Sequence, residues 1–217
     1  IDEEGDQLCV SADGIYAVED YLQSRYYMFR QVYFHRTLRS AESVLRVLLN
    51  RALYLIRDGK PVWYAAGTAF EKILNGQRLS LSEHLSLDDT DVLFHIKQWQ
   101  RSSDQILADL SQRFLHRRLF KAFDLDMPEA ERESFANEAR SAVERAGFDP
   151  QYYFVDDTGG DAAYSFYTRD TADPKNLIYV EDGFARPRIR EISECSAAVR
   201  GPQEGYRIRR ICFPAEV

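Results

Sequence analysis

The sequence is poor in cysteine and has no long apolar run, and each shortage excludes a class of protein. Its three cysteines stand far apart, at Cys9, Cys195 and Cys212, which argues against a disulfide framework and indicates a reducing compartment. No apolar run approaches about 18 residues, so we expect no membrane-spanning helix. Lysine and arginine number 28 against 35 acidic residues, and the resulting net charge of −7 does not favour nucleic acid. We therefore expect a cytoplasmic protein without a membrane or nucleic-acid partner.

The sequence also lacks the common metal-binding motifs. It has four histidines, none of which is followed by aspartate: His35, His84, His95 and His116. No two of them show the spacing H-x-x-x-H or H-E-x-x-H that places two ligands on one helix face. The scattered cysteines do not match the spacing of a zinc site. We therefore expect neither a metal ligand nor a catalytic residue in this chain.

The most informative segment is residues 20–36, which holds six aromatic residues and three arginines and is expected to form one helix. Four of its members recur at steps of four and therefore share one helix face: Tyr21, Arg25, Phe29 and Tyr33. A guanidinium between aromatic rings suits an anionic ligand that carries a flat ring, such as a nucleotide. The same pattern is compatible with an aromatic core seam whose arginines reach out to solvent, so both interpretations stay open.

Hydrophobic periodicity divides the chain into two parts. Residues 1–126 are expected to be mainly helical after a short strand at 7–10, with helices at 20–36, from 37 to a stop at 58–61, at 68–74, at 89–100 and from 102–104 onward. Residues 127–217 begin with a charged helix at 129–146. Strands are then expected at 152–155, 165–168, 176–180, 187–193 and 206–213, with a loop at 156–161. We therefore predict a mainly α fold followed by a small α+β subdomain.

Two charged clusters have both a structural and a functional interpretation. Asp88, Asp89 and Asp91 bring three carboxylates together as a metal site would, but we favour helix capping because their apolar surroundings do not converge. Five arginines alternate in two expected strands and would share one face if these strands paired: Arg186, Arg188, Arg190, Arg207 and Arg209. That face would suit RNA or single-stranded DNA, although nearby acidic residues favour pairing within the chain or between subunits.

Three matches in a fixed order give the sequence a family resemblance. The first is DGIYAVEDYL at 13–22, continued by Ser24-Arg25 and by VYFHR at 32–36. The others are Asp88-Asp89, a weaker match at a helix start, and LFK at 119–121, which follows HRR at 116–118. Together these segments resemble the HD-domain dNTP triphosphohydrolases, the family of bacterial dGTPase-like proteins and of the vertebrate SAM-and-HD enzyme. The matches span residues 5–125, and the remainder resembles the family's C-terminal α+β part in pattern only.

The resemblance implies roles for five residues. Arg25 matches the arginine that reaches the substrate triphosphate, which a planar guanidinium grips bidentately. Tyr33 matches the tyrosine that packs on the deoxyribose and helps to exclude a 2′-hydroxyl. Arg36, Arg117 and Lys121 match cations of a regulatory site that binds an activating nucleotide across subunits of an oligomer. From the residues alone, core packing of Tyr33 and an ordinary surface position for the three cations also stay open.

The resemblance also implies what surrounds this chain. In the family, the metal ligands precede the segment with which this chain begins, so we expect an upstream HD portion of the same protein that holds divalent Mg, Mn, Fe or Zn. The chain would then be the inactive C-terminal portion of a metal-dependent phosphohydrolase that converts a dNTP to deoxynucleoside and triphosphate. Its expected partners are a deoxynucleotide substrate, an activating nucleotide and further copies of itself in a homo-oligomer. The alternative is a non-catalytic nucleotide-sensing or oligomer-assembly module without a metal site.

Overall fold

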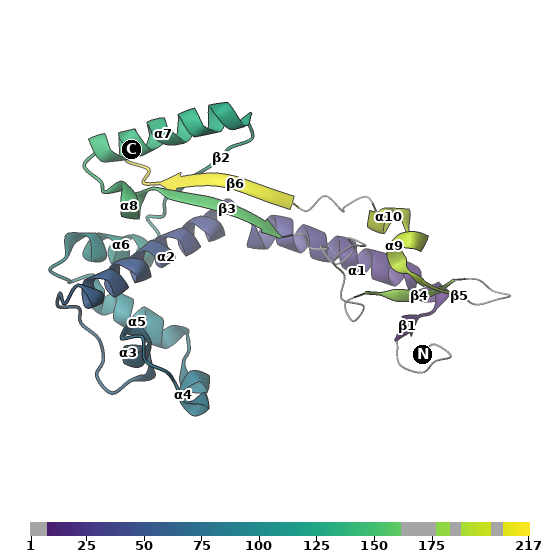
Figure 1. The fold of residues 1–217 in the computed structure, drawn as a ribbon, viewed down its shortest axis with the longest axis horizontal. Coiled ribbons are helices and arrows are strands. Elements are labelled where there is room, and N and C mark those ends of the chain that lie inside the picture. The colour runs from purple at the N-terminus through teal and green to yellow at the C-terminus, as the bar shows by residue number, and fades with distance from the viewer. Residues whose placement is uncertain (1–7, 162–176, 183–187, 201–205) are drawn as a thin grey trace. The chain divides into compact units, whose positions relative to one another are not determined.

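The computed structural model describes residues 8–161, 177–182, 188–200 and 206–217, and the chain divides into two compact units. Unit 1 comprises Ile1–His35 and Thr158–Ile208, and unit 2 comprises Arg36–Asp157 and Arg209–Val217. The boundary that we predicted near residue 126 therefore does not separate these two units, because each takes segments from both halves of the sequence. The predicted fold class is confirmed: the described residues form a mainly α fold with two small sheets (Figure 1).

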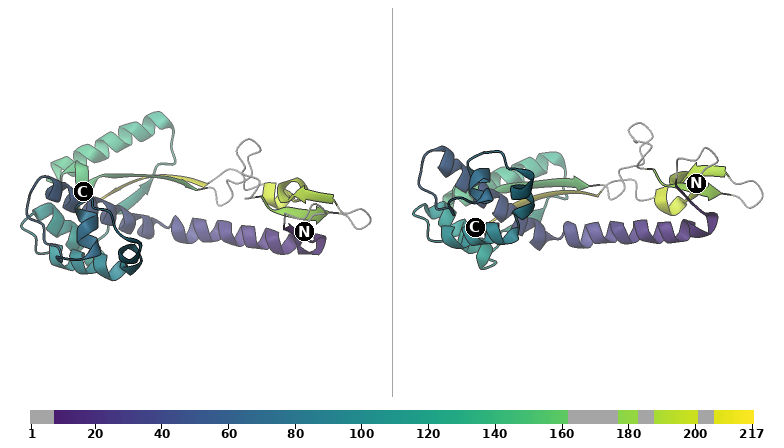
Figure 2. Two further views of the ribbon diagram at one scale, coloured as in Figure 1. Left: turned by 60° about the horizontal axis from the view of Figure 1, so that its bottom comes forward. Right: turned by 90° about the horizontal axis from the view of Figure 1, so that it is seen from below.

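Unit 1 is built on one long helix. Its described elements are β1 (Cys9–Val10), the 3-10 turn η1 (Ala12–Gly14), α1 (Ile15–Met28), the π-helix η2 (Phe29–Tyr33), β4 (Tyr179–Asp182), β5 (Arg188–Glu191), α9 (Ile192–Cys195) and α10 (Ala197–Arg200). Strand β1 pairs in parallel with β4, and β4 pairs antiparallel with β5. The apolar residues Ile15, Val18 and Leu22 of α1 pack on a small core of Val180, Ile192 and Val199. These contacts lie along the N-terminal part of α1, where β4, β5, α9 and α10 gather (Figure 2).

Unit 2 holds most of the helices and the larger core. Its helices are α2 (Arg36–Arg57), α3 (Ala69–Leu74), α4 (Leu81–Ser86), α5 (Asp89–Trp99), α6 (Gln105–Leu115), α7 (Glu129–Arg145) and α8 (Pro150–Tyr153). Its sheet has the order β2-β6-β3, formed by β2 (Lys121–Asp124), β6 (Tyr206–Phe213) and β3 (Val155–Asp161), and the boundary between the units falls within β3 and β6. Helix α7 runs along one side of this sheet (Figure 1).

Helix α2 forms the centre of the unit 2 core because its apolar residues recur with helical spacing. Val44, Leu48 and Leu55 are buried along one stripe, as the sequence predicts for this helix. They belong to a cluster that also holds Trp99 of α5 and Leu110 of α6. Each such side chain contributes roughly 1.5–3 kcal/mol on burial, so this stripe accounts for much of the stability of unit 2.

Helix starts were predicted well where a capping residue is present. Thr68, Asp88 and Asp104 each accept a hydrogen bond from a backbone amide in the first turn of α3, α5 and α6. At Asp88 the capping box is complete, because the Asp88 amide donates to the Asp91 carboxylate, so the capping interpretation of this acidic cluster is confirmed. Helix α4 was missed, although Ser80 and Glu83 form a second capping box at its start.

The prediction for residues 152–161 was wrong. Asp149 caps a short helix whose first residue is Pro150, so Tyr152 and Tyr153 are buried on α8 and not on a strand. The strand β3 follows at Val155–Asp161, where a loop was expected. A run of aromatic residues fits a buried helix turn as well as a strand, and this ambiguity caused the error. The strand predicted at 165–168 lies outside the described residues.

The condition for an arginine-rich sheet face, that its two strands pair, is not met. Strand β5, which carries Arg188 and Arg190, pairs with β4, whereas β6 pairs with β2 and β3 in a different sheet. The two arginine strands therefore do not pair with each other, and Arg186 lies outside the described residues. Arg190 contacts Glu194, with 3.6 Å between its Nε and a carboxylate oxygen, as the interpretation of pairing within the chain requires.

Candidate functional site

The predicted substrate residues lie together on the long helix of unit 1. The Arg25 guanidinium carbon lies 4.8 Å from the centroid of the Phe29 ring, and the Phe29 and Tyr33 rings are 4.9 Å apart. The face predicted from steps of four is thus continuous from Arg25 to Tyr33. Tyr33 is 47% exposed, so it is not part of a core formed by the described residues of unit 1. The geometry presents a cation and two aromatic rings on one face, on which Arg25 and Phe29 are half-buried and Tyr33 is exposed.

The end of this helix is wound differently from what periodicity predicts. Residues Phe29–Tyr33 form a π-helix, in which the amide of Phe34 donates to the carbonyl oxygen of Phe29 at 2.9 Å. A π-turn accommodates one extra residue and is frequent at functional sites. Here it begins at Phe29, four residues after Arg25, and ends at Tyr33, while the Phe34 side chain is buried. No signal in the sequence marked this turn, because the spacing of its aromatic residues also fits an α-helix.

The three predicted regulatory cations all belong to unit 2, and two of them lie on elements that touch. Arg36 is the first residue of α2, and Lys121 is the first residue of β2. The Ser40 hydroxyl, one turn after Arg36, donates to the carbonyl oxygen of Phe120 at 2.6 Å. This buried bond fixes the start of α2 beside the start of β2. The exposed side chains of Arg36 and Lys121 are therefore presented at one edge of unit 2.

Arg36 is already engaged by an acidic residue. Its guanidinium donates to Asp124, whose other carboxylate oxygen accepts from the buried Arg210. Although burial opposes the charged form of Asp124, hydrogen bonds and charge from Arg210 and Arg36 hold its pKa below the usual range. The Arg36 side chain remains 64% exposed, so an incoming anion can reach it. Sequence reasoning missed Asp124, because its partners lie on distant segments.

Arg117 has a backbone conformation that is rare for its residue type. It lies just after α6 with φ of 55°, and the amide of Arg118 donates to the carbonyl oxygen of Arg113 at 2.9 Å. This bond closes a Schellman motif, whose left-handed position is usually glycine. Glycine occupies the matching position after three other helices: Gly59 after α2, Gly76 after α3 and Gly147 after α7. An arginine in this position costs roughly 1 kcal/mol relative to glycine, and such strained positions are frequent at functional sites.

An ionic network around the buried Arg113 links α6 to the C-terminal residues in unit 2. Arg113 donates to Asp109 at 2.6 Å and to Glu216 at 3.3 Å, and the Tyr153 hydroxyl donates to Asp109 at 2.8 Å. Burial and the neighbouring Asp109 carboxylate raise the pKa of Tyr153, so its hydroxyl stays a donor. The spacing of four between Asp109 and Arg113 was the available signal for this pair. We interpret the network as structural, because its members satisfy one another.

The described residues offer no group of three His, Cys, Asp or Glu side chains that could hold a metal ion. These described residues therefore do not fit a divalent metal, which the family resemblance places in an upstream portion of the protein. None of the helices in the described part of the chain combines the length and apolarity that crossing a membrane requires.

Comparison with known proteins gives a relative and a structural neighbour, while no protein-family model matches the sequence. The protein YwfO of Bacillus subtilis (strain 168), which is described as uncharacterized, is 37% identical over 196 residues. This match covers 89% of the chain but 43% of YwfO, so the chain spans less than half the length of that relative. The crystal structure of a phosphohydrolase from Bacteroides thetaiotaomicron VPI-5482 matches with a TM-score of 0.73 and 22% identity. The match covers 96% of this chain and 52% of the neighbour, so the chain has the fold of about half of that phosphohydrolase.

Proposed function

We propose that this chain is the C-terminal portion of a cytoplasmic, metal-dependent HD-type phosphohydrolase that hydrolyses a dNTP to deoxynucleoside and triphosphate. The observation that carries the proposal is the continuous, accessible surface formed by Arg25, Phe29 and Tyr33. Support comes from the shared fold with a phosphohydrolase and from the sequence motifs that surround these residues.

In the proposed reaction, Arg25 binds the triphosphate. Water attacks the α-phosphorus, the bond from that phosphorus to the 5′ oxygen breaks, and the deoxynucleoside leaves with a proton on its 5′ oxygen. Negative charge then resides on the released triphosphate, and a guanidinium that holds its oxygens bidentately stabilises it. The Phe29 ring under the guanidinium restricts its movement, which lowers the entropy lost on binding.

Tyr33 would then act on the sugar. Its ring follows Phe29 at 4.9 Å between centroids and is partly exposed, so it offers a flat apolar surface next to the cation. A ring packed against the deoxyribose leaves no room for a 2′-hydroxyl, and a ribonucleotide is rejected by steric contact. In this proposal Arg25 binds the triphosphate and Tyr33 selects the sugar.

The remaining parts of the proposal concern other segments and other copies. A divalent metal and its ligands would lie in the part of the protein upstream of this chain, and α1 would pack against that part. Arg36, Arg117 and Lys121 would bind an activating nucleotide in a homo-oligomer. Because Arg36 is paired with Asp124, an activating nucleotide must compete with that carboxylate for the guanidinium. The strained backbone at Arg117 supports a ligand-binding role for its side chain.

The proposal is tested by incubating the full-length protein with dGTP and Mn²⁺ and resolving the products. Deoxyguanosine and tripolyphosphate are expected in equal amounts. A Tyr33→Ala variant is expected to show a smaller preference for dGTP over GTP than the unmodified protein. Release of pyrophosphate or of single phosphates contradicts the proposed cleavage position. Binding of dGTP without turnover supports the alternative of a nucleotide-sensing module.

A further inference from the structure

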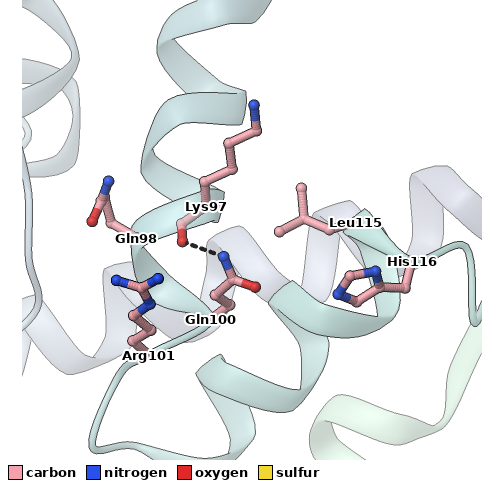
Figure 3. Close-up of a pocket in the computed structure, with 6 residues that line it drawn as sticks. All are labelled: Lys97, Gln98, Gln100, Arg101, Leu115 and His116. Carbon is pink, nitrogen blue, oxygen red and sulfur yellow. Dashed lines mark hydrogen bonds between the residues drawn. The ribbon is translucent and has the colours of Figure 1, made fainter.

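A basic depression lies in unit 2 at the ends of α5 and α6, just before Arg117 in the sequence. It has a volume of about 430 Å³ and is lined by six residues: Lys97, Gln98, Gln100, Arg101, Leu115 and His116. The first four come from the end of α5 and the turn after it, and the last two from the end of α6 (Figure 3). Its volume lies within the range of small-molecule sites in proteins.

The depression contains basic side chains that carry no compensating acid. Lys97, Arg101 and His116 are exposed, and none of them forms an ion pair with a described residue. Several other arginines of unit 2 are paired, as Arg51 is with Asp104 and Arg113 with Asp109. Unpaired cations gathered around one depression create a positive potential there, although the net charge of the chain is −7.

Helix ends explain only part of this charge. Both α5 and α6 point their C-termini at the depression, and each end contributes roughly half a negative charge that favours nearby cations. Lysine and arginine together exceed this partial charge by about one unit. The carbonyl oxygens are also partly satisfied, because the Gln100 amide donates to the Lys97 carbonyl oxygen at 2.8 Å and Gln112 donates to that of Gln100 at 3.3 Å. Positive charge is therefore left over for a ligand.

We propose that this depression binds the phosphate group of a small molecule. A phosphate carries more than one negative charge, so it matches an ammonium and a guanidinium better than a single carboxylate does. The Gln98 side chain and the His116 ring supply further polar groups, and Leu115 supplies an apolar contact for the rest of the molecule. The site does not depend on the proposed substrate residues Arg25 and Tyr33, which lie in unit 1, although His116 directly precedes Arg117 of the proposed regulatory site in the sequence.

The proposal is tested by titrating this chain with inorganic pyrophosphate at low ionic strength in a calorimeter. The double variant Lys97→Gln/Arg101→Gln is expected to bind at least roughly tenfold more weakly than the unmodified chain, because two charge-assisted contacts are lost. Arg46→Gln/Arg57→Gln is the matched control, since it removes the same charge from exposed positions of α2. The control and Arg25→Ala are both expected to keep the affinity of the unmodified chain.

Amide shifts in a ¹⁵N spectrum provide a second measurement that does not depend on a variant. Pyrophosphate is expected to shift the amides of Lys97, Arg101 and His116 most strongly. The proposal is overturned if the unmodified chain does not bind pyrophosphate, if both double variants lose affinity equally, or if the largest shifts lie elsewhere. Loss of binding in Arg25→Ala alone assigns the anion to the proposed substrate surface and also overturns it.

Discussion

The long helices of the two units differ in how many of their residues are buried. Helix α2 of unit 2 has seven buried residues, whereas α1 of unit 1 has none. On α1 the contacts with the unit 1 core come from Ile15, Val18 and Leu22, and large side chains such as Tyr21, 61% exposed, remain accessible. Exposed aromatic side chains gathered on one helix often mark a site where a ligand or another protein binds. The comparison shows that α2 of unit 2 is buried in a core whereas α1 is not, and we expect α1 to contact a ligand or another protein surface.

The largest expected effect tests this contrast directly. Leu48→Ala removes a fully buried side chain of α2 and is expected to lower the free energy of unfolding by about 2–5 kcal/mol. Tyr21→Ala removes an even larger side chain from α1, but because it is exposed we expect a change within about 0.5 kcal/mol. Chemical denaturation of this chain measures both. A large loss for Tyr21→Ala would break the comparison.

A smaller effect is expected at an ion pair of unit 2. Arg51 donates to Asp104 at 2.6 Å, and Asp104 also caps α6. Burial opposes ionisation of Asp104, but the Arg51 guanidinium and the Leu107 amide outweigh it and lower the pKa of the carboxyl group. Because the folded pKa is lower than the unfolded one, this stabilisation is complete above about pH 4 and is lost as the pH falls through the folded pKa.

Asp104→Asn keeps the capping oxygen and removes the charge. At neutral pH we expect the free energy of unfolding to fall by about 1–2 kcal/mol. The difference between this variant and the unmodified chain should shrink when denaturation is repeated at successively lower pH. A difference that stays constant down to strongly acidic pH would show that the pair does not depend on the Asp104 charge.

The smallest effect has the opposite sign and concerns Arg117. Arg117→Gly relieves the left-handed conformation and is expected to raise the free energy of unfolding by up to about 1 kcal/mol. The reverse change, Gly147→Arg after α7, is expected to lower it by a similar amount. If Arg117→Gly stabilises the fold and also weakens nucleotide activation of the full-length protein, then Arg117 lowers the stability of the fold and contributes to nucleotide binding. Unchanged stability of Arg117→Gly would show that the backbone of Arg117 is not strained, and the strain would no longer support a binding role.

Much of unit 2 was predictable because its signals are local. The apolar stripe of α2 and the capping residues Thr68, Asp88 and Asp104 placed α2, α3, α5 and α6 within about one or two residues, whereas α4 and α8 were missed. The pairing of strands was not predictable, because β6 joins β2 and β3 from a distant part of the chain. Asp157 illustrates the limit: it was assigned to a loop, yet it is buried on β3 and accepts from Arg39 at 3.2 Å.

In the candidate site, the shared helix face was predictable from the sequence, but the π-turn and the ion pair of Arg36 were not. Steps of four placed Arg25, Phe29 and Tyr33 on one face, and the ring contacts agree with this. The π-turn and the link between Arg36 and Asp124 were missed, because neither leaves a periodic pattern in the sequence. Roles for the individual residues rest on the family resemblance and stay predictions.

The most direct measurement is kcat/KM for dGTP in the full-length protein, compared between Arg25→Ala and Arg30→Ala. Both changes remove one arginine from the same helical segment, but Arg25, which stacks on Phe29, lies on the face predicted from steps of four, whereas Arg30 is not one of the positions of that face. We expect kcat/KM to fall by about 100-fold or more in Arg25→Ala, because the triphosphate loses a bidentate partner, and by less than about threefold in Arg30→Ala. Equal losses in the two variants, or full activity in Arg25→Ala, would contradict the proposal that this face of α1 binds the substrate.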